Sequence, residues 1–160
     1  MKQIIICNKS EVPKHVHRSG VTHIISLMDP GNHPYIPEHF NKQNWKIQYF
    51  EDIDDSKSPY APKKEHVDFV LEYVKTIPSD AVLLVHCLAG ISRSTAMTLG
   101  ILLQKNGKDK INECIAELKE IRPIANPNKL IVGYLDSIFG HNGKLEDKVY
   151  EEFREWWKHH

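Results

Sequence analysis

Residues 81–95, AVLLVHCLAGISRST, constrain the fold of this chain more than any other stretch. The first five residues are all apolar, a pattern that predicts a fully buried strand. A short turn of small and polar residues follows Cys87, and an apolar pattern at helical spacing begins at about Ser92. The stretch therefore predicts a strand, a tight turn and a helix, with backbone amides and the helix N-terminus directed at one point.

The predicted turn is suited to binding an anion, because unsatisfied amides and the helix macrodipole both favour negative charge there. Cys87 opens the turn, where the thiolate form is favoured, and a thiolate is a strong nucleophile. Arg93 closes the turn with a planar fork of donors that fits two phosphate oxygens. These features together indicate a site for phosphoryl transfer. The alternative is a core cysteine and a surface arginine, but a core cysteine requires neither the glycine turn nor Arg93.

The motif H-C-x5-R-S, which reads HCLAGISRS over residues 86–94, resembles the signature of the cysteine-based protein tyrosine phosphatases. It is most similar to that of the dual-specificity branch, and the resemblance extends over about residues 2–140. It implies an α/β fold with a short, mostly parallel central sheet flanked by helices and followed by a group of C-terminal helices. It implies no cofactor.

The resemblance also implies roles for individual residues. Cys87 would attack phosphorus, Arg93 would clamp the phosphate, and Ser94 would ease breakdown of the phosphocysteine. His86 would hold the loop through hydrogen bonds, and Asn128 of a Pro-Asn pair would brace it. The substrate would be bound along the loop, by Leu88, Ala89, Gly90, Ile91, Ser92 and Arg93. Plainer readings stay open for three of these residues: a buried core histidine, a hydroxyl in a first helical turn, and an ordinary helix start at Asn128.

A general acid must protonate the leaving oxygen, and in the family this acid is an Asp on the loop after the third strand. The corresponding loop here is acidic, with candidates at Glu51, Asp52, Asp54 and Asp55. The family's usual separation between acid and nucleophile favours Asp55, whereas Phe50-Glu51-Asp52 resembles the motif that carries the acid in several branches. We predict Asp52 as the acid, with Asp54 and Asp55 as alternatives.

The remaining pattern predicts alternating strands and helices, which favours a parallel sheet. Strands are expected at residues 2–7, 21–28, 45–50 and 81–86. Ser10 is expected to cap a first helix that ends near Gly20. Further helices are expected at residues 63–77, 92–105, 109–120, 128–139 and 145–158.

The length of 160 residues predicts one domain, with a core at about 2–140 and an additional C-terminal helix at about 145–158. That helix is amphipathic, with apolar residues at Val149, Phe153, Trp156 and Trp157. We expect it to pack on the domain, with an oligomer contact as the alternative.

The composition narrows the partners and the setting. The 21 basic and 21 acidic residues give no net charge to attract nucleic acid or a membrane surface. Three cysteines without framework spacing predict a reduced, cytoplasmic setting, and no apolar run is long enough to span a membrane. The ten histidines lack the spacing of metal ligands, so no metal is expected. The terminal His159-His160 resembles part of a purification tag, so no function is expected of these two residues.

The predicted substrate is a phosphorylated protein or a small phosphomonoester. The variable loop positions are uncharged, whereas relatives that act on phosphoinositides carry basic residues there. Two other functions stay open: a pseudophosphatase that binds phosphoproteins without turnover, and a sulfur-transfer enzyme of the rhodanese kind. The intact Cys, Arg and Ser disfavour the first, and the five-residue spacing and preceding His86 disfavour the second.

Overall fold

In the computed structural model, which describes residues 1–154 and 158, the four predicted strands form one parallel sheet. The strand order across the sheet is β1-β4-β2-β3, and all three pairings are parallel. The strands are β1 (Gln3–Cys7), β2 (His23–Met28), β3 (Trp45–Tyr49) and β4 (Val82–His86).

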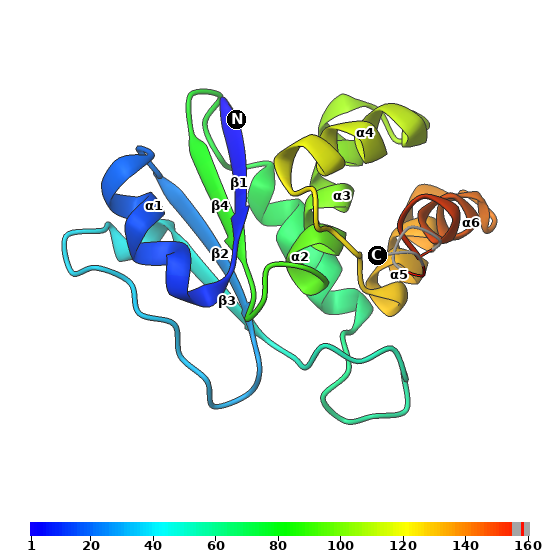
Figure 1. The fold of residues 1–160 in the computed structure, drawn as a ribbon, viewed down its shortest axis with the longest axis horizontal. Helices are drawn as coiled ribbons and strands as arrows, with labels where there is room; N and C mark the ends of the chain where they lie inside the picture. The colour runs from blue at the N-terminus through cyan, green and yellow to red at the C-terminus, as the bar shows by residue number, and fades with distance from the viewer. Residues whose placement is uncertain (155–157, 159–160) are drawn as a thin grey trace.

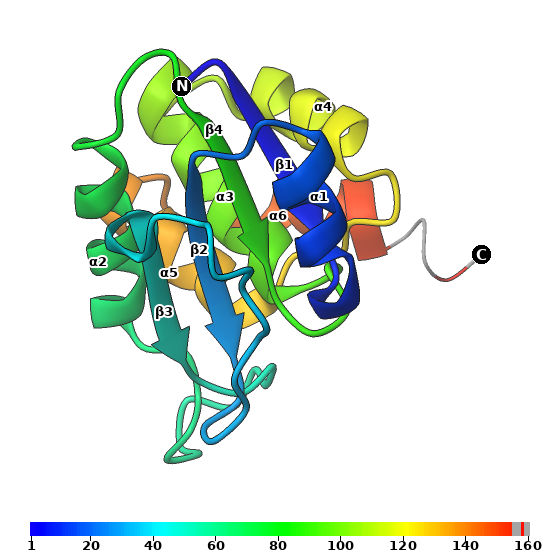
Figure 2. The ribbon, with the colours of Figure 1, turned by 90° about the vertical axis from the view of Figure 1, so that its left-hand side faces the viewer.

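Helices cover both faces of the sheet, which confirms the predicted α/β class. Figures 1 and 2 show one helix, α1 (Val12–Arg18), on one face and the other helices on the opposite face. These are α2 (Lys64–Val74), α3 (Arg93–Asn106), α4 (Ile111–Ile121), α5 (Lys129–Phe139) and α6 (Lys144–Val149). Shorter helical turns occupy Lys9–Glu11, Lys42–Asn44 and Tyr150–Arg154.

Each face of the sheet has its own apolar core, because successive strand side chains point to opposite faces. In β4, Leu83 and Val85 belong to the larger core under α2–α6, whereas Val82 and Leu84 belong to the smaller core under α1. Helix α3 runs through the larger core and has 11 buried residues. Its Gly100 lets α5 approach closely, since a Cβ there would lie 2.5 Å from Leu135 Cδ2.

One helix cap differs from the prediction. Asn8, not Ser10, caps the first helical segment: its Oδ1 accepts from the Glu11 amide at 3.0 Å. The Glu11 carboxylate accepts in return from the Asn8 amide at 3.2 Å, so the two residues form a capping box. Asn8 has the extended backbone that an N-cap requires, and Ser10 donates its hydroxyl to the Asn8 side chain.

The final helical segment is divided, with α6 continued by a π-helical turn over Tyr150–Arg154. Val149 and Phe153 are each 3% exposed and pack in the larger core. Trp156 and Trp157 lie outside the described residues. The apolar face that the structure describes is therefore buried within the chain, and an oligomer contact stays a prediction.

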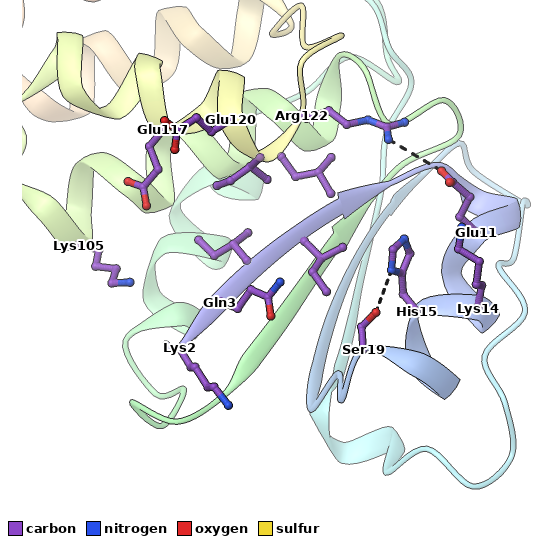
Figure 3. A pocket seen from close by; sticks show the side chains of 14 residues that line it. Lys2, Gln3, Glu11, Lys14, His15, Ser19, Lys105, Glu117, Glu120 and Arg122 are labelled. Carbon is purple, nitrogen blue, oxygen red and sulfur yellow. Dashed lines mark hydrogen bonds and ion pairs between the residues drawn. The ribbon is translucent and has the colours of Figure 1, made fainter.

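Strand β1 lies at one edge of the sheet and pairs with β4. A cavity of about 670 Å³ runs along this strand between α1 and α4. Figure 3 shows Arg122 at one end of the cavity, directed toward Glu11. Within residues 1–154 and 158, none of the helices combines the length and apolar character needed to cross a membrane.

Candidate active site

Three loops meet at the carboxyl edge of the sheet, where parallel strands commonly present ligand sites. Cys87 follows β4, Asp29 follows β2, and the Phe50–Asp52 segment follows β3. The loops enclose a cavity of about 410 Å³, which we call the Cys87 cavity. Its lining residues are Asp29, Glu51, Asp52, Ile53, Cys87, Leu88, Ala89, Ile91, Ser92 and Arg93. It thus contains the predicted nucleophile, clamp and acid.

The signature loop, residues 87–93, turns tightly against the end of β1. Gly90 has a φ of +69°, and a Cβ there would lie 2.6 Å from the carbonyl carbon and oxygen of Cys7. Both the left-handed backbone and the close approach require glycine at this position. The loop can therefore curl over the sheet edge only with Gly90 as it stands.

Arg122, which follows α4, holds the outer side of this loop. Its Nε donates to the Gly90 carbonyl at 2.8 Å, and its Nη2 donates to the Ala89 carbonyl at 3.3 Å. The Glu11 carboxylate lies 3.9 Å from its Nη1, the pair drawn in Figure 3. No local pattern predicts this contact, because Arg122 is 32 residues from Gly90 in the sequence.

Cys87 is 2% exposed and its sulfur receives donors from the loop. The Gly90 amide donates to Sγ at 3.3 Å, and the Ser94 hydroxyl lies 3.2 Å from it. Both groups can stabilise negative charge on the sulfur. Ser94 thus contacts the thiol of Cys87, the predicted nucleophile.

The other two cysteines lie in cores, as free thiols. Burial is the main cause that raises the pKa of Cys7, to about 12. Burial also raises the pKa of Cys114, which packs among apolar residues of the larger core. Both side chains are fully covered, so they remain protonated thiols near neutral pH.

Arg93 is anchored on one side and open on the other. Its Nη1 donates to Asp29 Oδ1 at 2.8 Å and to the Phe50 carbonyl at 2.7 Å. Its Nε is buried and has no hydrogen-bond partner among the described residues. An orphaned donor on a 3% exposed arginine is costly unless a ligand accepts from it. The cleft therefore suits an anion.

Asp29 was missed by the sequence analysis, although a signal was present. It directly follows the buried strand β2, and the ends of parallel strands lie at one edge. The Asp29 side chain is 42% exposed while that of Arg93 is 4% exposed. The carboxylate therefore fixes the guanidinium from the solvent side.

His86 is fully buried below the signature loop. Trp45 Nε1, which can only donate, bonds to Ser26 Oγ at 2.9 Å. The Ser26 hydroxyl is therefore free to donate to His86 Nε2, 2.6 Å away. That leaves the proton on Nδ1, which donates to the Cys87 carbonyl at 3.2 Å. Burial lowers the pKa of His86 to about 4, so the ring is neutral.

Asp52 is held at the mouth of the Cys87 cavity by two donors to one oxygen. Ser92 Oγ donates to Asp52 Oδ1 at 2.6 Å, and Asn128 Nδ2 donates to it at 2.9 Å. Asn128 Nδ2 also donates to the Ile53 carbonyl at 3.1 Å. The Asn128 side-chain oxygen accepts from the backbone amide of Ile131 and so caps α5. The backbone amide of Asn128 donates to the Ser92 carbonyl. It therefore links the acidic loop to the signature loop.

Asp54 and Asp55 line a neighbouring cavity of about 540 Å³ and do not line the Cys87 cavity. Asp55 Oδ1 accepts from the Lys57 amide at 3.0 Å, which is a local turn contact. Glu51 lines both cavities. The structure thus brings Asp52 and Glu51, but neither alternative acid, to the cavity of the nucleophile.

The lining of the Cys87 cavity combines a thiol, donors for an oxyanion and carboxyl groups. Within the described part of the chain, no group of three or more His, Cys, Asp and Glu side chains is arranged to hold a metal ion. The arrangement suits displacement at a bound oxyanion by sulfur, with a proton supplied from a facing carboxyl group in its protonated form.

Comparison with known proteins identifies the family of this chain. The family model described as "Dual specificity phosphatase, catalytic domain" matches residues 4–137. Mouse dual specificity protein phosphatase 15 is 30% identical over 145 residues, which cover 89% of this chain and 57% of the mouse protein. The Drosophila melanogaster dual specificity protein phosphatase Mpk3 is 32% identical over 97 residues, covering 59% of this chain and 23% of the fly protein. The chain thus spans little more than half the length of the mouse relative.

A similar fold occurs in a solved human structure. The tyrosine phosphatase-like serine/threonine/tyrosine-interacting protein superposes with a TM-score of 0.67 at 20% identity, over 89% of this chain and 99% of that one. At this identity the likeness concerns the fold alone. The family model and the sequence relatives confirm the membership that the signature motif suggested: the chain belongs to the dual specificity phosphatase catalytic-domain family.

Proposed function

We propose that this chain is a single phosphatase domain that hydrolyses phosphomonoesters on tyrosine, and on serine or threonine, through a phosphocysteine intermediate. The observation that carries the proposal is the shared cavity of Cys87, Arg93 and Asp52. The buried Arg93 Nε, without a partner among the described residues, supports a phosphate in that cavity. The match to a phosphatase family supports the same reaction class.

In the first step the Cys87 sulfur attacks phosphorus and the bond from phosphorus to the ester oxygen breaks. Asp52 gives its proton to the leaving oxygen, which departs as an alcohol or phenol. Arg93 and the loop amides stabilise the charge on the three remaining phosphoryl oxygens. The two donors to Asp52 Oδ1 leave its other oxygen to carry the proton.

In the second step a water oxygen attacks phosphorus and the sulfur–phosphorus bond breaks. Asp52, now a carboxylate, takes a proton from this water. The Ser94 hydroxyl, 3.2 Å from Sγ, stabilises the departing thiolate. Inorganic phosphate and the free thiolate are the products, so atoms and charge balance over the two steps.

The cavity wall supports a protein substrate. The residues around Cys87 that are not part of the chemistry include Ile53, Leu88 and Ile91. Their apolar side chains suit the ring of phosphotyrosine. Arg93 is the sole cationic side chain among the lining residues.

A nucleophilic thiol functions only when reduced, so we propose a reducing, cytoplasmic setting.

The alternative is a module that binds phosphoproteins without turnover. The same loop donors would bind the phosphate, and the human protein of similar fold is described as a tyrosine phosphatase-like, serine/threonine/tyrosine-interacting protein. The complete set of nucleophile, clamp, hydroxyl and acid in this chain favours the enzyme.

The decisive experiment is phosphate release from p-nitrophenyl phosphate and from a phosphotyrosine peptide. We expect turnover by the natural chain, none above background by Cys87→Ser, and retained turnover by Cys114→Ala, whose cysteine lies in the core. Binding of the phosphopeptide without any release by the natural chain would instead identify a binding module.

A further inference from the structure

A second cavity adjoins the signature loop on a wall different from that of the acidic loop. This Tyr35 cavity has a volume of about 620 Å³ and is lined by Asn8, Lys9, Ser10, Pro13, Tyr35, Leu88 and Ala89. It shares Leu88 and Ala89 with the Cys87 cavity. The neighbouring cavity of about 540 Å³ that Asp54 and Asp55 line is called the acidic cavity. It shares other residues with the Cys87 cavity, namely Glu51, Asp52, Ile53 and Ser92. The two flanking cavities therefore adjoin different parts of the reaction centre.

The walls of the Tyr35 cavity are tied together before any ligand binds. The Lys9 amide donates to the Leu88 carbonyl at 3.1 Å, which joins the turn before α1 to the signature loop. These two segments lie side by side in Figures 1 and 2. Lys9 Nζ donates to Asn32 Oδ1 at 2.6 Å, which joins the same turn to the loop after β2. Because the cavity is preformed, binding of a ligand costs little free energy for ordering the protein.

Two large side chains are exposed at this cavity. Tyr35 is 66% exposed although its neighbours Pro34 and Ile36 are both buried. Leu88 is 50% exposed. Because the backbone is anchored on both sides of Tyr35, its ring loses little conformational entropy when it contacts a ligand. Both side chains are therefore available for contact with an apolar group of a ligand.

The charges of the two flanking cavities differ. The Tyr35 cavity has no carboxylate among its lining residues, and Lys9 is its one charged side chain. The acidic cavity has four carboxylates, at Glu51, Asp52, Asp54 and Asp55, with Lys129 and Arg154. A polypeptide that crosses Cys87 therefore meets on one side a surface whose lining has no carboxylate and includes the exposed Tyr35 and Leu88, and on the other side an acidic surface.

We propose that the Tyr35 cavity is a substrate subsite, which binds an apolar side chain located about two residues from the phosphorylated residue of an extended protein segment. The inference rests on the proposed phosphatase function and adds a sequence preference to it. An extended chain advances about 3.3 Å per residue, so a side chain close to the phosphoresidue can reach past the shared residues Leu88 and Ala89. Tyr35 and Leu88 would contact that side chain directly.

The test measures binding of phosphotyrosine peptides to the Cys87→Ser chain, so it does not depend on turnover. The first peptide has only Ser and Gly beside the phosphotyrosine. The other two carry Leu two residues before it or two residues after it. We expect one of the Leu peptides to bind about tenfold more tightly than the first, the gain typical of burying one such side chain.

Variants then assign the gain to the cavity. Tyr35→Ala in the Cys87→Ser background should abolish the preference, and Tyr35→Phe should keep it. Phe69→Ala, which removes a 42% exposed aromatic ring on α2, is the matched control and should also keep it. Equal binding of all three peptides, or a preference that survives Tyr35→Ala, would overturn the subsite.

The same peptides separate this inference from the proposed function. With Cys87 intact, the preferred Leu peptide should have the larger kcat/KM, and Tyr35→Ala should reduce that ratio between peptides to about one. If the natural chain releases no phosphate from any peptide while the Cys87→Ser binding preference persists, the subsite is supported and the enzymatic function fails. Turnover without any Leu preference would support the enzymatic function and overturn the subsite.

Discussion

Arg93 is a side chain fixed on one edge and open to an anion on the other. Its Nη1 uses both Asp29 and the Phe50 carbonyl, two groups that follow neighbouring strands. Its Nε stays buried and has no partner among the described residues. The planarity of the guanidinium then fixes the direction in which the remaining donors point. The contact with Asp29 therefore positions the Arg93 guanidinium, as the proposed phosphate clamp requires.

The first prediction concerns that planarity. Arg93→Lys keeps the positive charge but cannot contact Asp29, Phe50 and a phosphate in one plane. We expect kcat/KM for p-nitrophenyl phosphate to fall by about a hundredfold, equal to about 2–3 kcal/mol of transition-state stabilisation. Steady-state kinetics at pH 6–7, with a check of folding by circular dichroism, measures this. Near-normal turnover in a folded variant would remove Arg93 from the mechanism.

The second prediction concerns the acid. A general acid matters only when the leaving group is basic, and it contributes about 10²–10⁴-fold. Asp52→Asn should therefore slow hydrolysis of phenyl phosphate by that order and have much less effect on an ester of a strongly acidic phenol. Asp54→Asn and Asp55→Asn are the controls, because these residues line the neighbouring cavity. If one of them shows the leaving-group dependence in place of Asp52→Asn, the assignment of the acid is wrong.

At the scale of elements, the signature loop is held by backbone and side-chain contacts from several directions. The turn before α1 contacts Leu88, and the segment between α4 and α5 contacts Ile91 and Ser92 through backbone amides. Arg122 at the end of α4 adds two donors to the loop carbonyls. These contacts bond the loop carbonyls from outside, while the Gly90 amide donates inward to Cys87 Sγ.

The third prediction tests Arg122 as a positioning residue. Arg122→Met should lower kcat by about tenfold, with a smaller change in KM, because loop carbonyls lose their partners and the amides lose their alignment. The free energy of unfolding should fall by about 1–2 kcal/mol, since the side chain is largely buried. Lys119→Met, which removes a more exposed cation of the same helix, is the control. A loss of stability with unchanged kcat would give Arg122 a purely structural role.

At the scale of the whole molecule, the reaction centre and the core share a polar chain. Trp45 on β3, Ser26 on β2 and His86 on β4 are hydrogen-bonded in sequence across the sheet and end at the Cys87 carbonyl. Burial keeps His86 neutral in the folded chain, with its pKa lowered from 6.5 to about 4. The stability of the sheet is therefore linked to the protonation of one histidine.

The fourth prediction follows from this linkage. Between pH 6.5 and about 4 the unfolded chain binds a proton at His86 that the folded chain does not, so this contribution to stability is present at pH 7 and lost as the pH falls. The loss attributable to His86 should amount to about 3 kcal/mol by pH 4. Urea unfolding at pH 7 and pH 4.5 should show a smaller acid loss for His86→Gln than for the natural chain. His17→Gln, at an exposed site, should show the full loss, and an equal loss in His86→Gln would contradict the linkage.

The sequence by itself determined the parallel sheet, the helices and the strand–turn–helix unit around Cys87. These follow from local periodicity and from the chemistry of short motifs, which act between residues close in the chain. The cap at Asn8 shows the limit of such reasoning. Asn8 and Ser10 are both good capping residues, and the backbone conformation at Asn8 decides between them.

Only the tertiary structure decided which groups surround the signature loop. Asp29, Ser26 and Arg122 contact loop or strand residues 32 to 64 positions away. Asp29 directly follows a buried strand and so has a local signal, whereas Ser26 and Arg122 have none, because their contacts depend on how the strands and helices pack. The acidic loop is the clearest case: periodicity does not orient side chains in a loop, so the prediction of Asp52 rested on a motif while the spacing favoured Asp55. Asn128, 76 residues further along the chain, fixes Asp52 at the cavity through a hydrogen bond that forms only when α5 packs beside the loop.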